Sequence, residues 1–302
     1  MVRQHDVAVV VDSGSCLPPG LLHQWDITVV PHEFAVDGQT FGDGVDLHPG
    51  EFYQQLKNKR GALTTAPPRP QQFLEAFIAA GELAPNVLCL TLSSNFSAAY
   101  QSARAAAVLA GSRMPDVRVE VIDSQAVAGA SGLIALAAAR WAAKGYSMGR
   151  VIAGVNQLIP RVDLIAFLES LYYLGRSGRV GKLQAWTSSI LRIRPVTELK
   201  LGEARILEKP RSRARAAQRI LDLMGQQVGR SQITLNVMGA DSQEDAQALL
   251  GKIQAEFNCR EAFLSEFTPV LGAYTGPGLL GVAFYMHDGD EEEPPQETPQ
   301  TP

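Results

Sequence analysis

The sequence predicts an α/β protein of two domains, an N-terminal α/β/α domain with a parallel sheet and a C-terminal α/β domain with a mixed or antiparallel sheet. Over the first half of the chain, short β-branched strands alternate with helical segments, as in a parallel sheet covered on both faces by right-handed crossovers. In the second half of the chain, the strand candidates follow one another closely, and only two helical segments interrupt them. With 302 residues and 46% hydrophobic content, the chain has enough core for two domains.

The N-terminal elements follow from short apolar runs and their flanking turns. Strands are expected at residues 7–11, 27–30, 87–92 and 117–122. Helices are expected near residues 16–24, 70–80, 98–110 and 125–144. The segment 32–50 is rich in glycine and ends at Pro49, so we expect an excursion of turns over one edge of the domain. The helix at 125–144 is apolar almost all round and should be buried; it is either plain core or the wall of a ligand tunnel.

The pattern changes near Gly145 or Pro160. Strand candidates follow at 163–168, 192–199, 204–208, 232–238, 260–266 and 281–286, with helices near 211–228 and 242–256. We therefore predict an N-terminal domain at 1–158, a C-terminal domain at 159–287 and a disordered acidic tail at 288–302.

Composition excludes several classes of protein. A net charge of −4 does not favour nucleic-acid binding. The N-terminus has no apolar signal core, and no uninterrupted apolar run reaches membrane-spanning length, so we expect a cytoplasmic protein. The three cysteines and five histidines lack metal-ligand spacing. We expect no metal and no cofactor.

Two hydroxyl-rich turns are the candidate binding loops. One contains Thr64 and Thr65 before two prolines, and the other, 93–97, contains Ser94 and Ser97 between a strand and a helix. Such a junction offers free backbone N–H groups and the positive end of a helix dipole to an anion. Neither turn contains Lys or Arg, so a carboxylate fits better than a triphosphate. The alternative is structural: Ser97 caps its helix, and Thr65 shapes a turn.

These segments also carry a resemblance. The chain resembles the DegV family of bacterial fatty-acid-binding proteins in an ordered series of motifs: Val11-Asp12-Ser13, Thr65-Ala66-Pro67-Pro68, Ser93-Ser94-Asn95-Phe96-Ser97, Val121-Ile122-Asp123-Ser124, Leu174-Gly175-Arg176-Ser177-Gly178-Arg179 and Tyr274-Thr275-Gly276-Pro277-Gly278. The resemblance implies a long-chain fatty acid enclosed between two domains as the bound ligand, with Thr65, Ser97, Ser94 and Tyr274 in its site. It also implies a carrier that performs no chemistry, in some members beside a separate fatty acid kinase subunit that phosphorylates the carboxylate.

Three positions depart from the family pattern. Ala66 stands where a serine is usual, Ala98-Ala99 replaces a usual Gly-Thr, and Tyr274 replaces a histidine. Alanine suits position 98 only if the backbone there avoids positive φ. A tyrosine can donate a hydrogen bond to a carboxylate but carries no positive charge at neutral pH.

Arginines cluster where the second domain begins. Arg176 and Arg179 lie in a short basic turn, and Arg211 and Arg213 follow in a run that also contains glutamates. Guanidinium groups bind phosphates and carboxylates through paired hydrogen bonds. We interpret these four residues as a docking face for a kinase partner; a solvated, salt-bridged face is the alternative.

Two other functions stay open. The first is an acyl- or phosphoryl-transfer enzyme with Ser94 or Ser97 as nucleophile, although no histidine lies near either turn in the sequence to act as its base. The second is an arginine-rich docking module. The sequence favours a lipid carrier over both.

Overall fold

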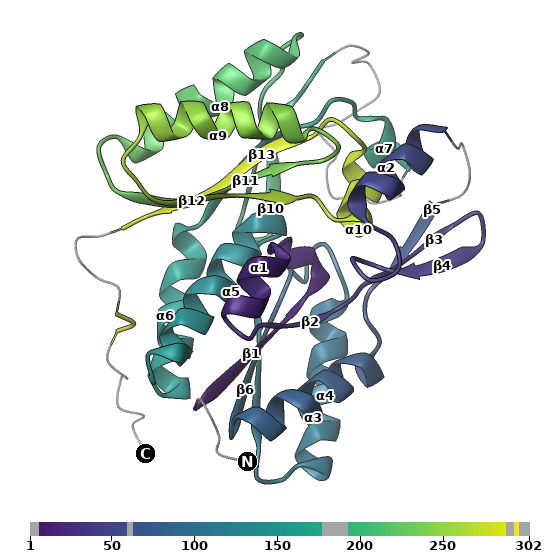
Figure 1. The fold of residues 1–302 in the computed structure, drawn as a ribbon, viewed down its shortest axis with the longest axis vertical. Helices are drawn as coiled ribbons and strands as arrows, with labels where there is room; N and C mark the ends of the chain where they lie inside the picture. Colours follow the sequence, from purple (N-terminus) through teal and green to yellow (C-terminus); the bar gives the residue numbers. More distant parts are fainter. Residues whose placement is uncertain (1–5, 59–62, 177–192, 288–292, 296–302) are drawn as a thin grey trace.

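The structure is a computed structural model that describes residues 6–58, 63–176, 193–287 and 293–295. Two α/β domains are stacked one on the other, with the N-terminal domain below in Figure 1. This confirms the predicted fold class. The predicted boundary at residue 158 stays a prediction, and most of the predicted tail at 288–302 lies outside the described residues.

The N-terminal domain contains a four-stranded parallel sheet in the order β2 (Thr28–Val30), β1 (Val7–Asp12), β6 (Asn86–Thr91), β7 (Arg118–Asp123). Alternate residues of β1 are buried on opposite faces. Val10 packs with α3 (Pro70–Leu83) and α4 (Ala99–Arg113), whereas Val9 and Val11 pack with α5 (Ala128–Ala143). Burial on both faces explains the continuous apolar runs of these strands.

The C-terminal domain contains a six-stranded mixed sheet. Its order is β10 (Glu203–Glu208), β9 (Val196–Lys200), β8 (Asp163–Phe167), β13 (Leu280–Met286), β11 (Ile233–Gly239), β12 (Cys259–Glu266). Helices α8 (Arg213–Val228) and α9 (Gln243–Glu256) cover one face, as expected. Figure 1 shows both helices on the outer side of this sheet.

Helix α5 packs against the sheets of both domains. Its residues pack against β1 of the first sheet and against β11 and β13 of the second. Glycine makes this possible, since a Cβ on Gly129 would lie 2.0 Å from Asn236 Oδ1 and one on Gly132 would lie 2.5 Å from the carbonyl oxygen of Ser15. The small side chains of this helix therefore serve close packing between the sheets.

The segment 32–50 is more regular than the sequence suggested. In place of an excursion of turns, β3 (Glu33–Val36) and β4 (Gln39–Gly42) form a hairpin, and β5 (Leu63–Ala66) pairs with β3. The prediction was wrong because Asp37 and Gly38 form a tight hairpin turn, both with positive φ. Phe34 and Phe52 of the following helix pack edge to face at 5.3 Å.

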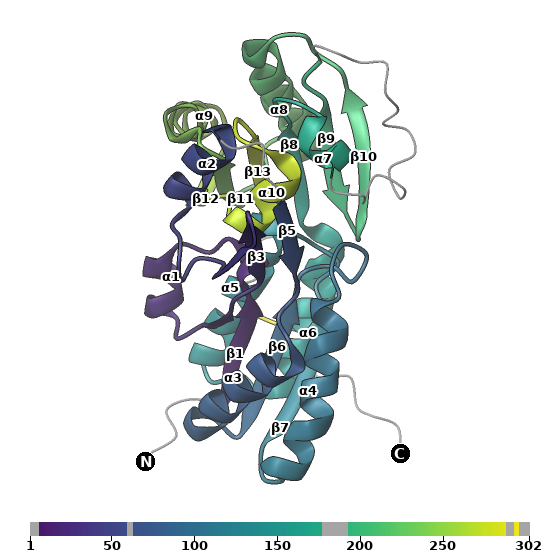
Figure 2. The same cartoon turned by 90° about the vertical axis from the view of Figure 1, so that its right-hand side faces the viewer.

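Further short helices complete the fold. They are η1 (Ser13–Ser15), α1 (Pro19–Gln24), α2 (Pro49–Asn58), α6 (Met148–Leu158), η2 (Ile159–Arg161), α7 (Tyr172–Arg176) and α10 (Pro269–Thr275). Helix α10 contacts α2, β3 and β5, and Figure 2 shows it between the three-stranded sheet and the C-terminal domain. The small sheet is thus held against the second domain.

Candidate functional site

The carboxyl ends of the parallel strands meet at the junction of the domains. Asp12 ends β1, Thr91 ends β6, and the loop 93–97 follows directly. Strand order reverses between β1 and β6, because the chain first adds β2 on one side of β1 and later β6 on the other. Open α/β sheets bind ligands at such a switch point.

Backbone hydrogen bonds fix the loop 93–97. The N–H of Ser93 donates to the Ala126 carbonyl (2.8 Å), and the N–H of Ser94 donates to the Asp123 carboxylate (3.2 Å). The N–H of Ala99, the first residue of α4, donates to Ser97 Oγ (3.1 Å). Ala98 has φ −85°, so alanine is tolerated there. The hydroxyl of Ser97 therefore helps to begin the helix while its residue lines a cavity.

Thr65 and Tyr274 bring hydroxyls from the two domains together. Thr65 Oγ1 on β5 hydrogen-bonds the Tyr274 hydroxyl on α10. Both residues are partly buried and line the same cavity as Ser94 and Ser97. The structure thus brings all four predicted ligand-binding residues to one cavity.

That cavity has a volume of about 580 Å³. Polar lining residues come mostly from the loops of the N-terminal domain, whereas apolar ones come largely from the second domain, including Leu164, Ala166, Leu199, Phe267, Leu271 and Leu279. The volume lies within the usual range for small-molecule sites, and most such sites have an apolar lining with a few placed polar groups. Of the predicted helix at 125–144, Val127 lines the cavity, and it lies just before α5. Most of the rest of the segment packs in the core between the sheets.

A hairpin of the second domain contacts the loop 93–97. The turn between β9 and β10 contains Leu201 and Gly202, both with positive φ. Asn95 Nδ2 donates to the Gly202 carbonyl (3.1 Å), and the Gly202 N–H donates to the Gln125 carbonyl (2.6 Å). A Cβ on Gly202 would lie 2.9 Å from Ser93 Oγ. The turn therefore packs directly on the binding loop.

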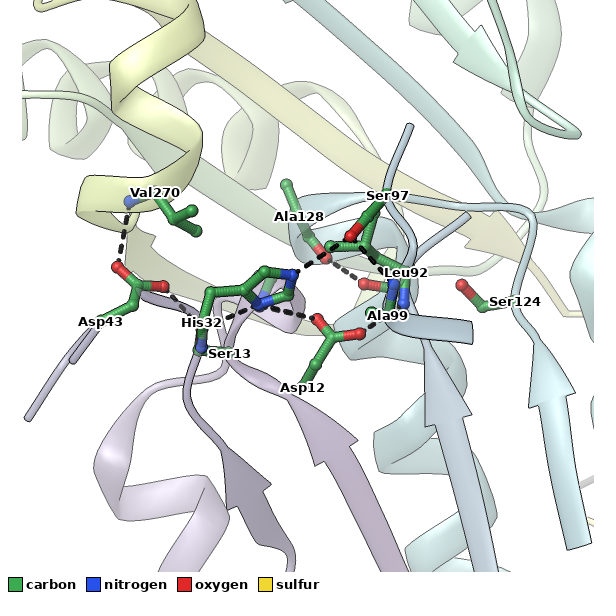
Figure 3. A network of polar contacts seen from close by, with 12 residues as sticks. Asp12, Ser13, His32, Asp43, Leu92, Ser97, Ala99, Ser124, Ala128 and Val270 are labelled. Atoms are coloured by element: carbon green, nitrogen blue, oxygen red, sulfur yellow. Dashed lines mark hydrogen bonds and ion pairs between the residues drawn. The ribbon is translucent and has the colours of Figure 1, made fainter. Parts of the chain in front are cut away.

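Sequence reasoning missed a buried polar network behind Ser97 (Figure 3). His32, only 3% exposed, follows β2 and places Nε2 3.4 Å from Ser97 Oγ. On its other side, His32 Nδ1 lies 3.3 Å from Ser13 Oγ and 3.8 Å from Asp12 Oδ1. The Ser13 hydroxyl donates to Asp43 Oδ2 (2.6 Å). No histidine lies near these loops along the sequence, yet the fold brings His32 into contact with one of them.

Two buried acids belong to this network. Burial raises the pKa of the Asp12 carboxyl to about 7, against hydrogen bonds from the Leu92 and Gly14 N–H groups that lower it. Burial also raises the pKa of Asp43, against a hydrogen bond from Ser13 and one from the Val270 N–H (3.0 Å). The only sequence signal for these residues was Asp12-Ser13 after the first strand.

The four predicted docking arginines differ in their surroundings. Arg213 contacts Glu169 (3.2 Å), Asp245 (2.6 Å) and the Gly278 carbonyl, and its guanidinium lies 5.0 Å from the centre of the Phe167 ring. Arg211 is exposed. Arg176 is the last residue of α7, and Arg179 lies outside the described residues. Arg213 thus holds structural contacts within its own domain.

Two other kinds of feature are absent from the residues that the structure describes. Within them, no group of three or more His, Cys, Asp or Glu side chains could hold a metal ion. In the same part of the chain, no helix is long and apolar enough to cross a bilayer.

Comparison with known proteins gives matches over nearly the whole chain. A family model described as "Uncharacterised protein, DegV family COG1307" matches residues 6–287. A DegV domain-containing protein of Caldanaerobacter subterraneus subsp. tengcongensis is 31% identical over 279 residues, 92% of this chain and 98% of that protein. One from Streptomyces coelicolor is 31% identical over 278 residues, 91% of this chain and 97% of its own length.

Solved structures show the same fold. A DegV family protein from Thermus thermophilus, described by its fatty acid binding, is 28% identical with a TM-score of 0.85, covering 93% of this chain and 100% of that one. A stearic acid-binding protein from Eubacterium ventriosum has a TM-score of 0.85 at 23% identity, covering 93% and 98% of the two chains.

Proposed function

Because this chain belongs to the DegV family, we propose that it binds a long-chain fatty acid in the cavity between its two domains. The observation that carries this proposal is the cavity itself, apolar on the side of the second domain and lined by hydroxyl groups at the strand ends of the first. The fatty acid binding described for the Thermus thermophilus relative supports it.

The acyl chain supplies most of the affinity. Each buried CH₂ group contributes about 0.8 kcal/mol, so a tail of roughly fifteen carbons gives on the order of 12 kcal/mol before the costs of association. Leucine side chains of β8 and β9 and the apolar residues around α10 provide the contact surface. The polar groups then determine which end of the ligand faces the loops.

The carboxylate is held by hydroxyl donors. A carboxylate that loses water needs hydrogen bonds to replace it. Thr65 provides one from β5, and Ser97 provides one from the loop 93–97. Tyr274 provides a third hydroxyl in contact with Thr65, and Ser94 also lines the cavity. Tyr274 thus keeps a donor where the family has a histidine, without the charge.

Extraction of the purified protein tests this function. Protein produced in a bacterial host should release fatty acid in near-equal molar amount on denaturation, identified by mass spectrometry. Stripped protein should take up added fatty acid. Folded protein that releases none and takes up none would contradict the proposal.

A second candidate function is acyl transfer through Ser97, favoured by the 3.4 Å contact with His32. We favour binding over it because His32 Nδ1 lies 3.8 Å from Asp12, beyond hydrogen-bond distance, and both Asp12 oxygens already accept backbone N–H groups. Hydrolysis of a p-nitrophenyl acyl ester that is lost in Ser97→Ala would instead support the enzyme.

We extend the proposal to a partner and a location. Presentation of the carboxylate to a separate fatty acid kinase subunit follows from the family resemblance. Of the four arginines predicted to dock this subunit, Arg211 is exposed and suits contact with it. A cytoplasmic location is supported by Cys16, Cys89 and Cys259, which are all free thiols.

A further inference from the structure

His32 is the one basic side chain among the described residues that line the cavity. It is buried and contacts the hydroxyl of Ser97. It lies in the segment that follows β2, outside both predicted binding loops. A ligand carboxylate at Ser97 would bring a negative charge close to this imidazole and to Asp12 and Asp43 behind it. The proton count of this network therefore decides whether the carboxylate is attracted or repelled.

The proton on Nδ1 follows from the contacts of Ser13. A serine hydroxyl has one proton and two acceptor positions. Ser13 donates its proton to Asp43 and accepts from the N–H of His32 (3.1 Å). Its remaining contact, with His32 Nδ1 at 3.3 Å, is therefore a bond in which Nδ1–H donates.

The proton on Nε2 follows from what Ser97 must do for a ligand. Ser97 Oγ already accepts from the Ala99 N–H. If Nε2 is unprotonated, the single Ser97 proton points to it, and none remains for a carboxylate. If Nε2 carries a proton, Ser97 Oγ accepts from the Ala99 N–H and from His32 Nε2–H, and the hydroxyl donates its own proton to the ligand. Ser97 can thus bind a carboxylate while His32 is an imidazolium.

Asp12 is placed to compensate that charge. Its two oxygens accept the N–H groups of Gly14 (2.9 Å) and Leu92 (2.8 Å), which favours the carboxylate form, and Oδ1 lies 3.8 Å from Nδ1. Burial opposes this effect and raises the pKa of Asp12 to about 7, so in the lipid-free protein a proton bound by the pair lies on Asp12. A ligand carboxylate at Ser97 then favours transfer of this proton to the imidazole, which contacts Ser97. A pair this close titrates as a unit.

The other titratable groups around the pair are neutral at neutral pH or lie beyond a bridging serine. Burial raises the pKa of Cys16 to about 12 and raises those of Cys89 and Tyr53 as well, so these groups add no charge. Asp43 is reached through Ser13, and the Tyr274 hydroxyl contacts Thr65. Among the described residues, no Lys or Arg side chain lines the cavity.

We infer that His32 is the charged member of the carboxylate site and that a fatty acid binds together with one proton held by the His32–Asp12 pair. This inference rests on the proposed function and adds the proton, the residue that holds it and a preference for free acids. Neutral lipids with the same tail, such as a methyl ester or a fatty alcohol, take up no proton when they bind.

Binding of cis-parinaric acid, a fluorescent fatty acid, as a function of pH tests the inference. The acid is ionised in water across the neutral and mildly alkaline range, so a pH effect there belongs to the protein. Affinity should fall by up to about tenfold per pH unit once the pair is unprotonated. Calorimetry above pH 7, where the free pair is unprotonated, in phosphate and in Tris, whose ionisation heats differ, should give one proton taken up per acid bound. The methyl ester should give none.

Two variants locate the proton. His32→Gln keeps an amide that can donate to Ser97 but cannot titrate, and its affinity should be weaker and independent of pH. His287→Gln removes a histidine that contacts Thr234 in a different cavity and should keep the pH dependence.

The outcomes separate the two proposals. Fatty acid binding with equal affinity at every pH and no buffer dependence of the heat would overturn the inference alone. Full pH dependence in His32→Gln would do the same. If the wild-type protein binds no fatty acid at any pH, the proposed function fails and the inference falls with it. The calorimetry uses wild-type protein, so the test survives a His32 variant that does not fold.

Discussion

Thr65 on β5 and Ser97 in the loop 93–97 each bring one hydroxyl to the cavity. Replacement of either by alanine should weaken fatty-acid binding by about 1–3 kcal/mol, the cost of leaving a buried charged acceptor short of a donor. Titration of stripped protein with a fluorescent fatty acid measures the change.

Thr64→Ala is the matched control, because Thr64 is the exposed neighbour of Thr65 on the same strand. It should bind as the wild type does. Ser97→Ala should also lower lipid-free stability by about 1 kcal/mol, since the Ala99 N–H loses its acceptor. If that is its only effect, Ser97 serves the helix and not the ligand.

Asp12 should make the lipid-free protein more stable in mild acid than at neutral pH. Its pKa is raised from 3.8 to about 7 by burial, so the folded state binds the proton more tightly than the unfolded chain. Its contribution is therefore fully present below pH 3.8 and is lost as pH rises through 7, at up to about 1.4 kcal/mol per pH unit.

Urea unfolding at a series of pH values measures this slope. Asp12→Asn should flatten it, because the amide does not titrate. An unchanged slope in that variant would assign the effect to other groups, of which Asp43 is the nearest with a pKa shifted in the same direction.

At the scale of elements, the β9–β10 turn controls the loop that binds the ligand. Gly202→Ala forces an alanine to φ +73° and brings its Cβ to 2.7 Å from Asn95 Nδ2. We expect a stability loss of about 1–2 kcal/mol from the backbone, together with weaker fatty-acid binding because the turn moves off Asn95.

Gly229→Ala separates the two causes. Gly229 also has positive φ, +57°, but a Cβ there would meet nothing within 4 Å. This variant should lose stability and keep its affinity. If both variants keep full affinity, the turn does not act on the site.

The regular elements were predictable because their patterns are local. The strand predicted at 87–92 and the helix predicted at 98–110 correspond to β6 and α4, and every end agrees within three residues. Buried parallel strands and amphipathic or small-residue helices can be recognised from local runs of apolar residues. The hairpin of β3 and β4 was missed because its short strands are half exposed and flanked by glycine.

The binding loops were predictable from their residue types and from the family resemblance, whereas the network behind them was not. His32 reaches Ser97 across 65 positions of sequence, and Asp43 reaches Ser13 across 30. Nothing in the spacing of these residues indicates that contact, because tertiary packing alone creates it. In the sequence, Arg213 likewise resembles an exposed basic residue. Its contacts with the Glu169 carboxylate and the Gly278 carbonyl come from tertiary packing.

At the scale of the whole molecule, the partner surface should involve Arg211 without Arg213. Charge reversal of Arg213 would break its internal ion pairs and disturb the turn at Gly278 beside the cavity. Arg211→Glu should leave fatty-acid affinity unchanged and impair phosphorylation by a matching kinase subunit. The measurement is a paired binding and phosphorylation assay.

Arg230→Glu is its control. Arg230 is also exposed and follows the opposite end of α8, a helix of 16 residues, which is about 24 Å long. Equal phosphorylation in both variants would leave Arg211 as a solvated residue. Lost lipid binding in Arg211→Glu would place it in the ligand site.

The packing of α5 against the sheets of both domains determines how a ligand can enter. Many two-domain binding proteins admit ligands by swinging their domains apart about a hinge. Here one buried helix packs on both sheets and joins them in a single apolar core, so such a swing would expose that core. Entry and exit must instead use smaller movements of α10, the β3–β5 sheet or the β9–β10 turn. Exchange of fatty acid should then follow the microsecond-to-millisecond gating of local elements, with the two domains fixed.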